Sequence, residues 1–261
     1  MKIVIIGKRS FLSKQLKSSI KNSIILSSNF LKNKKSVKKY ITDNNIFIIN
    51  SFYPLFKILS NKTNNVSMTR QSIGFILKFL KVIKNKRDIK IIYSSTCAVK
   101  NFDTDQFNSR SVYTSQKVLC EQVLKEYCDK YKINLVITRL FNLFGGHDRA
   151  SIIFKILSAT QKSPIIINNG GNSKRDFIHV KDVALIYKKL IKSNFAGYID
   201  VGTGKSVAIK KLINLKNKKF FLNKNKIYEK KTSVANVNLL KKVVNIKKFI
   251  KVEEFVKKRI K

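Results

Sequence analysis

Tyr113 and Lys117, in the stretch VYTSQKVLCEQ, are the two residues whose types and spacing best suit a chemical step. Residues four apart share one face of a helix. A free phenol has a pKa of about 10 and is a poor base at neutral pH, but a neighbouring ammonium lowers that pKa. Such a pair suits proton transfer to or from a sugar hydroxyl while a hydride moves to nicotinamide. The same spacing also arises by chance in ordinary amphipathic helices.

A second candidate lies upstream, where an apolar run ends in consecutive hydroxyl residues in IIYSSTCAVK. If this run is a buried strand, its end directs Thr96 toward the edge at which a cofactor binds. The Thr96 hydroxyl can then donate a hydrogen bond to a substrate oxygen and stabilise its developing charge. A polar strand end without any function explains the pattern equally simply.

The first turn of the chain, in IIGKRSFLSKQL, has the outline of a phosphate-binding loop, with an apolar run, a glycine and a helical pattern. Such loops usually carry two or three glycines, because the backbone must approach a pyrophosphate closely. Here only Gly7 is present, and Ser10 and Ser13 occupy the later positions. Their hydroxyls can bond phosphate, but the motif alone favours an ordinary strand-turn-helix.

Apolar strands and helices alternate along the chain. We expect strands at residues 2–6, 23–26, 46–50, 90–94, 134–139, 164–167 and 197–201, and helices at 12–21, 35–42, 65–84, 113–131 and 180–192. The strands are mostly apolar throughout, as strands buried on both faces must be. This order predicts an α/β fold with a Rossmann-like doubly wound parallel sheet, in which nucleotides bind at the carboxyl ends of the strands.

Composition bounds the class of protein. The 261 residues, 44% of them hydrophobic, suffice for one large domain or for one domain with a small lobe. No apolar run approaches the roughly 18 residues of a membrane helix, and we expect a cytoplasmic protein without membrane contact. Three cysteines and two histidines, His147 and His179, lack metal-ligand spacing, so no metal is expected. The formal charge of +41 would suit nucleic acid, but lysine is spread widely without a recognition motif, so no specific nucleic-acid partner is expected.

The order of these motifs resembles the extended short-chain dehydrogenase/reductases, specifically the NAD(P)-dependent nucleotide-sugar epimerase/dehydratase family. The resemblance covers nearly the whole chain and rests on GKRSFLS, NVSMT, YSSTCAV, YTSQK, TRLFNLFG, RDFIHVKDVA, DVGTGKSVAI and TSVANVNLLKKVVNI. It implies a Rossmann domain, a small C-terminal sugar-nucleotide lobe, bound NAD or NADP and, in many members, a helical homodimer interface. We place the NAD(P)-binding domain at residues 1–141 plus roughly 176–205, and the lobe at roughly 142–175 plus 206–261.

Matching positions carry the family's roles onto this chain. The resemblance makes Tyr113 the acid/base, Lys117 its partner and ribose anchor, and Thr96 the hydroxyl that polarises the substrate. The expected cofactor-binding residues are Gly7, Ser10, Phe11, Leu12, Ser27 and Lys117, and the expected residues for the nucleotide sugar are Thr96, Asn142 and Arg175. A guanidinium at Arg175, in a glycine-containing loop, is also a natural pyrophosphate clamp on its own chemistry. His179 is expected to be structural.

Some residues of this chain differ from those of the family that it resembles, and these differences limit which reaction and cofactor we expect. Family dehydratases carry acidic residues after the catalytic threonine, whereas Cys97 and Ala98 stand there, which disfavours dehydration. Cys97 is expected to be a buried, inert thiol. The strand at 23–26 is followed by Ser27, not by the acidic residue that binds the adenosine ribose hydroxyls of NAD, and nearby lysines tilt the prediction toward NADP.

The leading prediction is a nucleotide-sugar epimerase or keto-sugar reductase that supplies precursors of a surface polysaccharide. Two family glycines are absent from the first loop, which motivates a second hypothesis, a nucleotide-binding homologue without catalysis. A basic nucleic-acid-binding protein is a distant third.

Overall fold

The computed structural model describes residues 2–50, 65–101, 109–146, 151–216, 221–224 and 230–260, so His147 lies outside the described residues. The chain divides into two compact units, Met1–Arg139 with Tyr187–Ile199, and Leu140–Ile186 with Asp200–Lys261. Each unit has an apolar core of its own. No helix within the described ranges is both long enough and apolar enough to cross a membrane.

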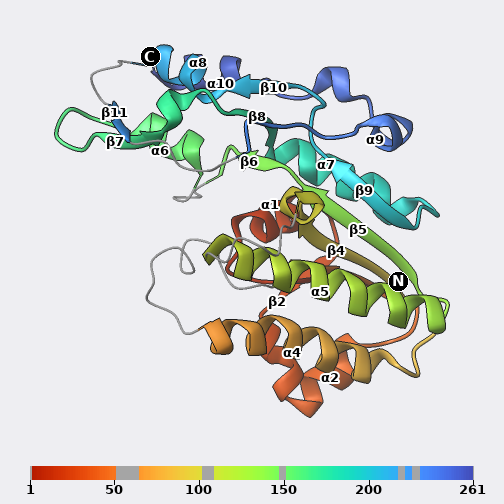
Figure 1. Cartoon of the computed structure of the whole chain (residues 1–261). Helices are drawn as coiled ribbons and strands as arrows, with labels where there is room; N and C mark the ends of the chain where they lie inside the picture. Colours follow the sequence, from red (N-terminus) through yellow and green to blue (C-terminus); the bar gives the residue numbers. More distant parts are fainter. Residues whose placement is uncertain are drawn as a thin grey trace. The chain divides into compact units, whose positions relative to one another are not determined.

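The first unit is built on a six-stranded sheet (Figure 1). Its strands, in spatial order, are β2 (Ser23–Leu26), β1 (Ile3–Ile6), β3 (Ile46–Ile49), β4 (Lys90–Thr96), β5 (Asn134–Leu140) and β9 (Gly197–Val201). The pairs β1–β2, β1–β3 and β3–β4 are parallel. The order reverses on either side of β1, which is the doubly wound arrangement predicted from the sequence, and the fold class is confirmed.

Helices of the first unit bury the apolar faces of this sheet. They are α1 (Phe11–Ser19), α2 (Lys34–Tyr40), α4 (Asn65–Ile83), α5 (Ser109–Lys130) and the end of α7 (Val180–Lys192), with 3₁₀ turns at Ser28–Lys32 and Cys97–Asn101. Helices α4 and α5 run side by side (Figure 1). Phe79 of α4 meets Phe47 of β3 edge to face, with ring centroids 5.0 Å apart. The core therefore fixes how α4 and α5 lie on β3 and β4.

The second unit carries several short strands. In one sheet, β8 (Lys174–His179) pairs with β10 (Ser206–Ala208), β12 (Thr232–Ser233) and β6 (Asn142–Phe144), and in another β7 (Ile165–Asn168) pairs with β11 (Phe221–Lys224). The helices are α6 (Ile152–Ser158), the start of α7, α8 (Ile209–Asn214), α9 (Asn238–Val243) and α10 (Val252–Ile260), with 3₁₀ turns at Asn169–Gly171 and Ile246–Lys248. The strand expected at 164–167 therefore belongs to a separate small sheet and not to the main one.

The position of β8 alters two sequence expectations. Residues 176–186 fall in the second unit, because β8 pairs with β6, β10 and β12, whereas we had placed them in the first domain. Arg175 lies in β8 and not in a glycine loop, because only Asn169–Gly171 forms the turn and the strand begins at Lys174. The partners β6, β10 and β12 have only two or three residues, too few to show a strand pattern in a sequence.

Asp176 holds the second unit together from within β8. Its side chain has no exposed surface, and its carboxylate accepts hydrogen bonds from Thr203 N at 2.8 Å, Thr203 Oγ1 at 2.6 Å, Gly204 N at 2.9 Å and Ala235 N at 3.1 Å. A buried carboxylate is tolerated only when donors replace its hydration. This one ties β8 to the segments around Thr203 and Ala235.

We expect Asp176→Ala to lower the free energy of unfolding by about 3 kcal/mol or more, because it leaves buried donors without an acceptor. Glu254→Ala is the control in the same unit. Its side chain is 58% exposed and its ion pair with Lys251 is a surface contact, so we expect the free energy of unfolding to stay close to that of the wild-type protein. Urea denaturation measures both, and equal losses in the two variants would contradict the role given to Asp176.

Candidate functional site

Gly7 lies at the end of β1 in a backbone conformation that excludes other residues. Its φ is 122°, and a Cβ added there would stand 2.4 Å from the carbonyl oxygen of Asn50 and 3.3 Å from Ser13 Oγ. The turn therefore packs directly on the chain that follows β3. A side chain at this position would push the two strands apart, so the single remaining glycine of the loop is a steric requirement.

Asn50 also binds the two serines that stand where the family has glycines. Its Nδ2 donates to Ser10 Oγ at 2.8 Å and to Ser13 Oγ at 2.9 Å. Ser10 is the N-cap residue of α1, yet its side chain makes no cap hydrogen bond. The first bond of the helix runs from Lys14 N to Ser10 O at 3.1 Å. The backbone N–H groups of the first turn, from Phe11 onward, therefore form an uncapped helix N-terminus, the kind of site that binds phosphate.

Strand β4 docks onto α5 through three consecutive residues. Ser94 O accepts a hydrogen bond from Lys117 Nζ at 2.6 Å. Ser95 Oγ donates to Glu121, and the Thr96 hydroxyl is hydrogen-bonded to Tyr113. The three partners on α5 are four residues apart and so share one helix face. The structure thus brings Thr96, Tyr113 and Lys117 together at the end of β4.

Tyr113 is a neutral phenol in this environment. Burial raises its pKa above the ordinary value, Cys97 adds to the rise, and the hydrogen bond with Thr96 opposes it. Cys97 is partly exposed, so the expectation of a buried thiol is wrong; it begins a 3₁₀ turn directly after β4. The desolvated site favours the protonated form. Tyr113 is therefore set to donate a proton, or to accept one when nearby positive charge compensates.

Lys117 is buried to 2% exposure, and burial lowers its pKa to about 7, with Cys120 and Glu121 opposing the shift. Its Nζ also lies 4.6 Å from the centre of the Tyr93 ring. An ammonium in such a place is retained only where carbonyl, carboxylate and aromatic groups stabilise it. Lys117 is therefore a partly charged amine at neutral pH.

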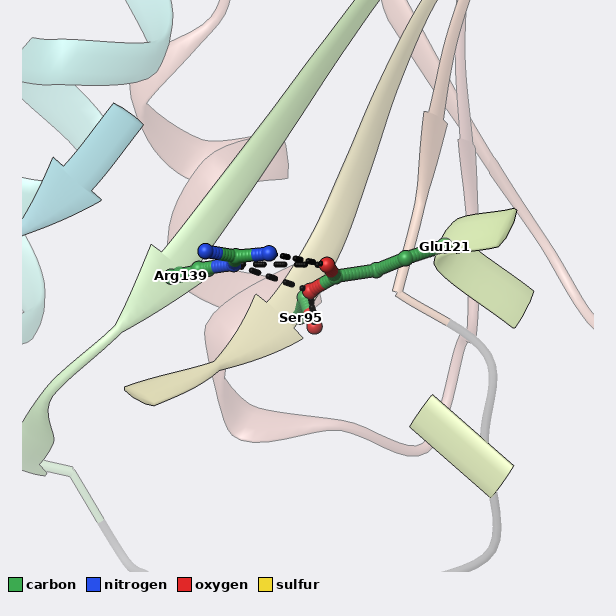
Figure 2. A network of polar contacts seen from close by, with 3 residues as sticks. All are labelled: Ser95, Glu121 and Arg139. Carbon is green, nitrogen blue, oxygen red and sulfur yellow. Dashed lines mark hydrogen bonds and ion pairs between the residues drawn. The ribbon is translucent and has the colours of Figure 1, made fainter. Parts of the chain in front are cut away.

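Glu121, one helical turn after Lys117, also joins α5 to the sheet, and sequence reasoning missed it. Figure 2 shows Ser95 from β4 and Arg139 from β5 converging on its carboxylate. Arg139 Nη2 donates to Oε2 at 2.6 Å, and Nε lies 3.3 Å from both oxygens. The Arg139 guanidinium also stacks on Tyr198 at 4.5 Å. The signal was available, because Glu121 follows Lys117 at the same spacing of four that pairs Lys117 with Tyr113.

The structure also describes three other residues that were predicted from the sequence, Ser27, Asn142 and Arg175. Ser27 is exposed after β2, where its Oγ accepts from Asn29 N at 3.4 Å. In the second unit, Asn142 donates from its amide to Asp176 O at 2.9 Å, and Arg175 donates from Nη1 to Lys230 O at 2.7 Å. Asn142 and Arg175 thus each have a defined position within the second unit.

The second unit also holds His179, which we expected to be structural. His179 packs edge to face with Phe144 at 5.0 Å, its Nδ1 accepts from Lys181 N at 3.1 Å, and burial lowers its pKa to about 4. These contacts are those of a structural histidine. Within the described ranges, no group of three or more histidine, cysteine and acidic side chains is arranged as a metal site requires.

A model of the NAD dependent epimerase/dehydratase family matches residues 8–201 of this chain. Among solved structures, the chain is similar to UDP-N-acetylglucosamine 4-epimerase from Methanobrevibacter ruminantium M1 in complex with UDP-N-acetylmuramic acid. The TM-score is 0.81 and the identity 22%, over 99% of this chain and 96% of that chain.

Two more structures extend the range of activities. RMD from Pseudomonas aeruginosa, complexed with NADPH, gives a TM-score of 0.78 at 15% identity, over 99% of this chain and 97% of that chain. The dTDP-glucose 4,6-dehydratase from Bacillus anthracis, in complex with NAD, gives 0.78 at 14%, over 100% and 95%. At these identities the likeness concerns the fold, and it holds for an epimerase and a dehydratase alike.

The lowered pKa of Lys117 predicts how the free energy of unfolding depends on pH. Its folded value of about 7 lies below the ordinary 10.5, so between these values the unfolded chain binds more protons and stability rises with pH. Relative to Lys117→Met, the wild-type protein should gain up to about 1.4 kcal/mol for each pH unit above 7. Urea denaturation at a series of pH values measures the difference. Lys188→Met, at an exposed position, is the control, and parallel curves for wild type and Lys117→Met would contradict a buried amine.

Proposed function

The chain belongs to the NAD dependent epimerase/dehydratase family, and on that premise we propose that it binds NAD or NADP and transfers a hydride at a carbon of a nucleotide sugar. The match confirms the family predicted from the motifs. Within it we favour a nucleotide-sugar epimerase or a keto-sugar reductase. The observation that carries the proposal is the docking of three consecutive residues of β4 onto α5, which gathers Thr96, Tyr113 and Lys117 at one strand end.

The first loop fits a dinucleotide. Gly7 leaves the room that a Cβ would fill, and the uncapped N-terminus of α1 offers backbone donors to a pyrophosphate. We propose that Gly7, Ser10, Phe11 and Leu12 bind it through their backbone. Ser27, exposed after β2, would lie at the adenosine ribose, and no carboxylate at that position repels a 2′-phosphate. The lysines that follow, in the 3₁₀ turn Ser28–Lys32 and in α2, favour NADP at this place.

When bound, the nicotinamide supplies the acceptor or donor of the hydride. We propose that Tyr113 moves the proton of the reacting sugar hydroxyl, because its phenol is neutral and partly exposed beside Thr96. Thr96 donates a hydrogen bond to the same substrate oxygen and stabilises the charge that develops there. Lys117, a partly charged amine one helical turn along α5, anchors a ribose hydroxyl and favours the phenolate when the proton leaves.

The second unit is the proposed sugar-nucleotide lobe, with Asn142 and Arg175 as its contacts to the substrate. A guanidinium matches phosphate oxygens in shape and charge, which supports this role for Arg175. We favour epimerisation or reduction over dehydration, because Cys97 and Ala98 follow Thr96 and supply no carboxylic acid to expel a hydroxyl. A role in cytoplasmic synthesis of surface-polysaccharide precursors stays a prediction from the sequence.

Calorimetry with the oxidised and reduced forms of NAD and NADP tests the cofactor assignment. We expect the wild-type protein to bind at least one of them, and Gly7→Ala to weaken that binding by tenfold or more, about 1.4 kcal/mol, because its Cβ would displace the loop. Gly74→Ala is the matched control, since a Cβ at Gly74 would meet no atom within 4 Å. Wild-type protein that binds none of the four dinucleotides would overturn the proposed function.

A further inference from the structure

Asn50 has two features that the proposed function does not use. Its side chain is 3% exposed at the end of β3, and its Nδ2 donates to both Ser10 and Ser13. Its Oδ1 is buried and has no hydrogen-bond partner within the described residues. A buried acceptor without a donor is destabilising and is rare in proteins. The oxygen without a partner belongs to the same side chain that contacts the first turn of α1 through Nδ2.

The amide of Asn50 changes what Ser10 can do. A serine at the N-cap ordinarily accepts a hydrogen bond from the backbone N–H of the second or third helical residue, here Leu12 or Ser13. In this chain the Ser10 hydroxyl accepts from Asn50 at 2.8 Å and makes no cap bond. The donors of the first turn are thereby left for another acceptor. A phosphate oxygen is the acceptor that such a helix end prefers.

The backbone of Asn50 serves the same turn. Its carbonyl oxygen lies where a Cβ on Gly7 would be, and its N–H donates to Ile6 O at 2.9 Å. One residue at the end of β3 therefore requires the glycine at the start of the loop and holds the serines at its two later positions. In the family those two positions are glycines, whose missing side chains leave the helix end open without help.

We propose that Asn50 is a positioning residue for the cofactor, which holds the serine side chains away from the N-terminus of α1 so that the pyrophosphate can bind there. The proposal rests on the proposed function, because it assumes a dinucleotide at this loop. It explains how a loop with one glycine can keep the site that the family builds with three. It also assigns the hydroxyl of Ser10 to Asn50 and leaves only the backbone of Ser10 to the phosphate.

The test compares dissociation constants of the dinucleotide that the wild-type protein binds. In Asn50→Ala the freed Ser10 hydroxyl can cap its own helix and compete with the phosphate, so affinity should fall about tenfold. Adding Ser10→Gly to Asn50→Ala removes the competing hydroxyl and should restore affinity to within about threefold of wild type. A residue that only stabilised the fold would not be rescued in this way, because glycine loosens the helix start further.

Asn45→Ala is the matched control, at the other end of the same strand. Asn45 is 1% exposed, donates to Tyr40 O at 3.1 Å and accepts from Lys2 N at 3.3 Å. It should lower the melting temperature and leave cofactor affinity unchanged. Should Asn50→Ala not fold, Ser10→Gly alone decides: the proposal expects affinity equal to wild type or better, and a tenfold loss overturns it.

The outcomes separate the two proposals. Wild-type protein that binds no dinucleotide overturns the proposed function and this inference with it. Wild-type binding together with unchanged affinity in Asn50→Ala, or a loss that Ser10→Gly does not rescue, overturns the role of Asn50 and leaves the proposed function in place.

Discussion

The hydrogen bond from Lys117 Nζ to Ser94 O, 2.6 Å long, is the contact on which the candidate site depends. Burying an amine is unfavourable, and the lowered pKa of Lys117 records that. The contact nevertheless fixes the register of α5 on β4. With Lys117 opposite Ser94, Tyr113 one turn earlier reaches Thr96, and Glu121 one turn later reaches Ser95 and Arg139. Loss of this register would separate the phenol from the threonine.

The order of strands brings the other half of the site to the same edge. Strands β1, β3 and β4 are neighbours and run parallel, so the segments that follow them lie side by side at their carboxyl ends. Gly7 and Ser10 follow β1, Asn50 follows β3, and Thr96 ends β4. Each is a small or polar residue directly after a buried apolar strand. The topology of the first unit therefore places the first loop, the Asn50 amide and the Thr96 hydroxyl at one edge of the sheet. Helix α5 adds Tyr113 and Lys117.

The sequence predicted the strongly patterned elements of the first unit and missed the shortest strands of the second. Strands such as 46–49 are uniformly buried and apolar, and α7 was predicted over its observed range. Strands β6, β10 and β12 have two or three residues, and their pairing is set by tertiary contacts such as those of Asp176.

Motif spacing gave Tyr113, Lys117 and Thr96, whereas Asn50 and Arg139 became visible only when neighbouring strands were placed together. The most direct test of the account follows the absorbance of nicotinamide when a panel of sugar nucleotides is mixed with the cofactor-loaded protein. The account predicts that one sugar nucleotide changes that absorbance as hydride moves, and that Tyr113→Phe slows the change about 10²–10⁴-fold while cofactor and sugar nucleotide still bind. A change of equal rate in wild type and Tyr113→Phe would contradict it.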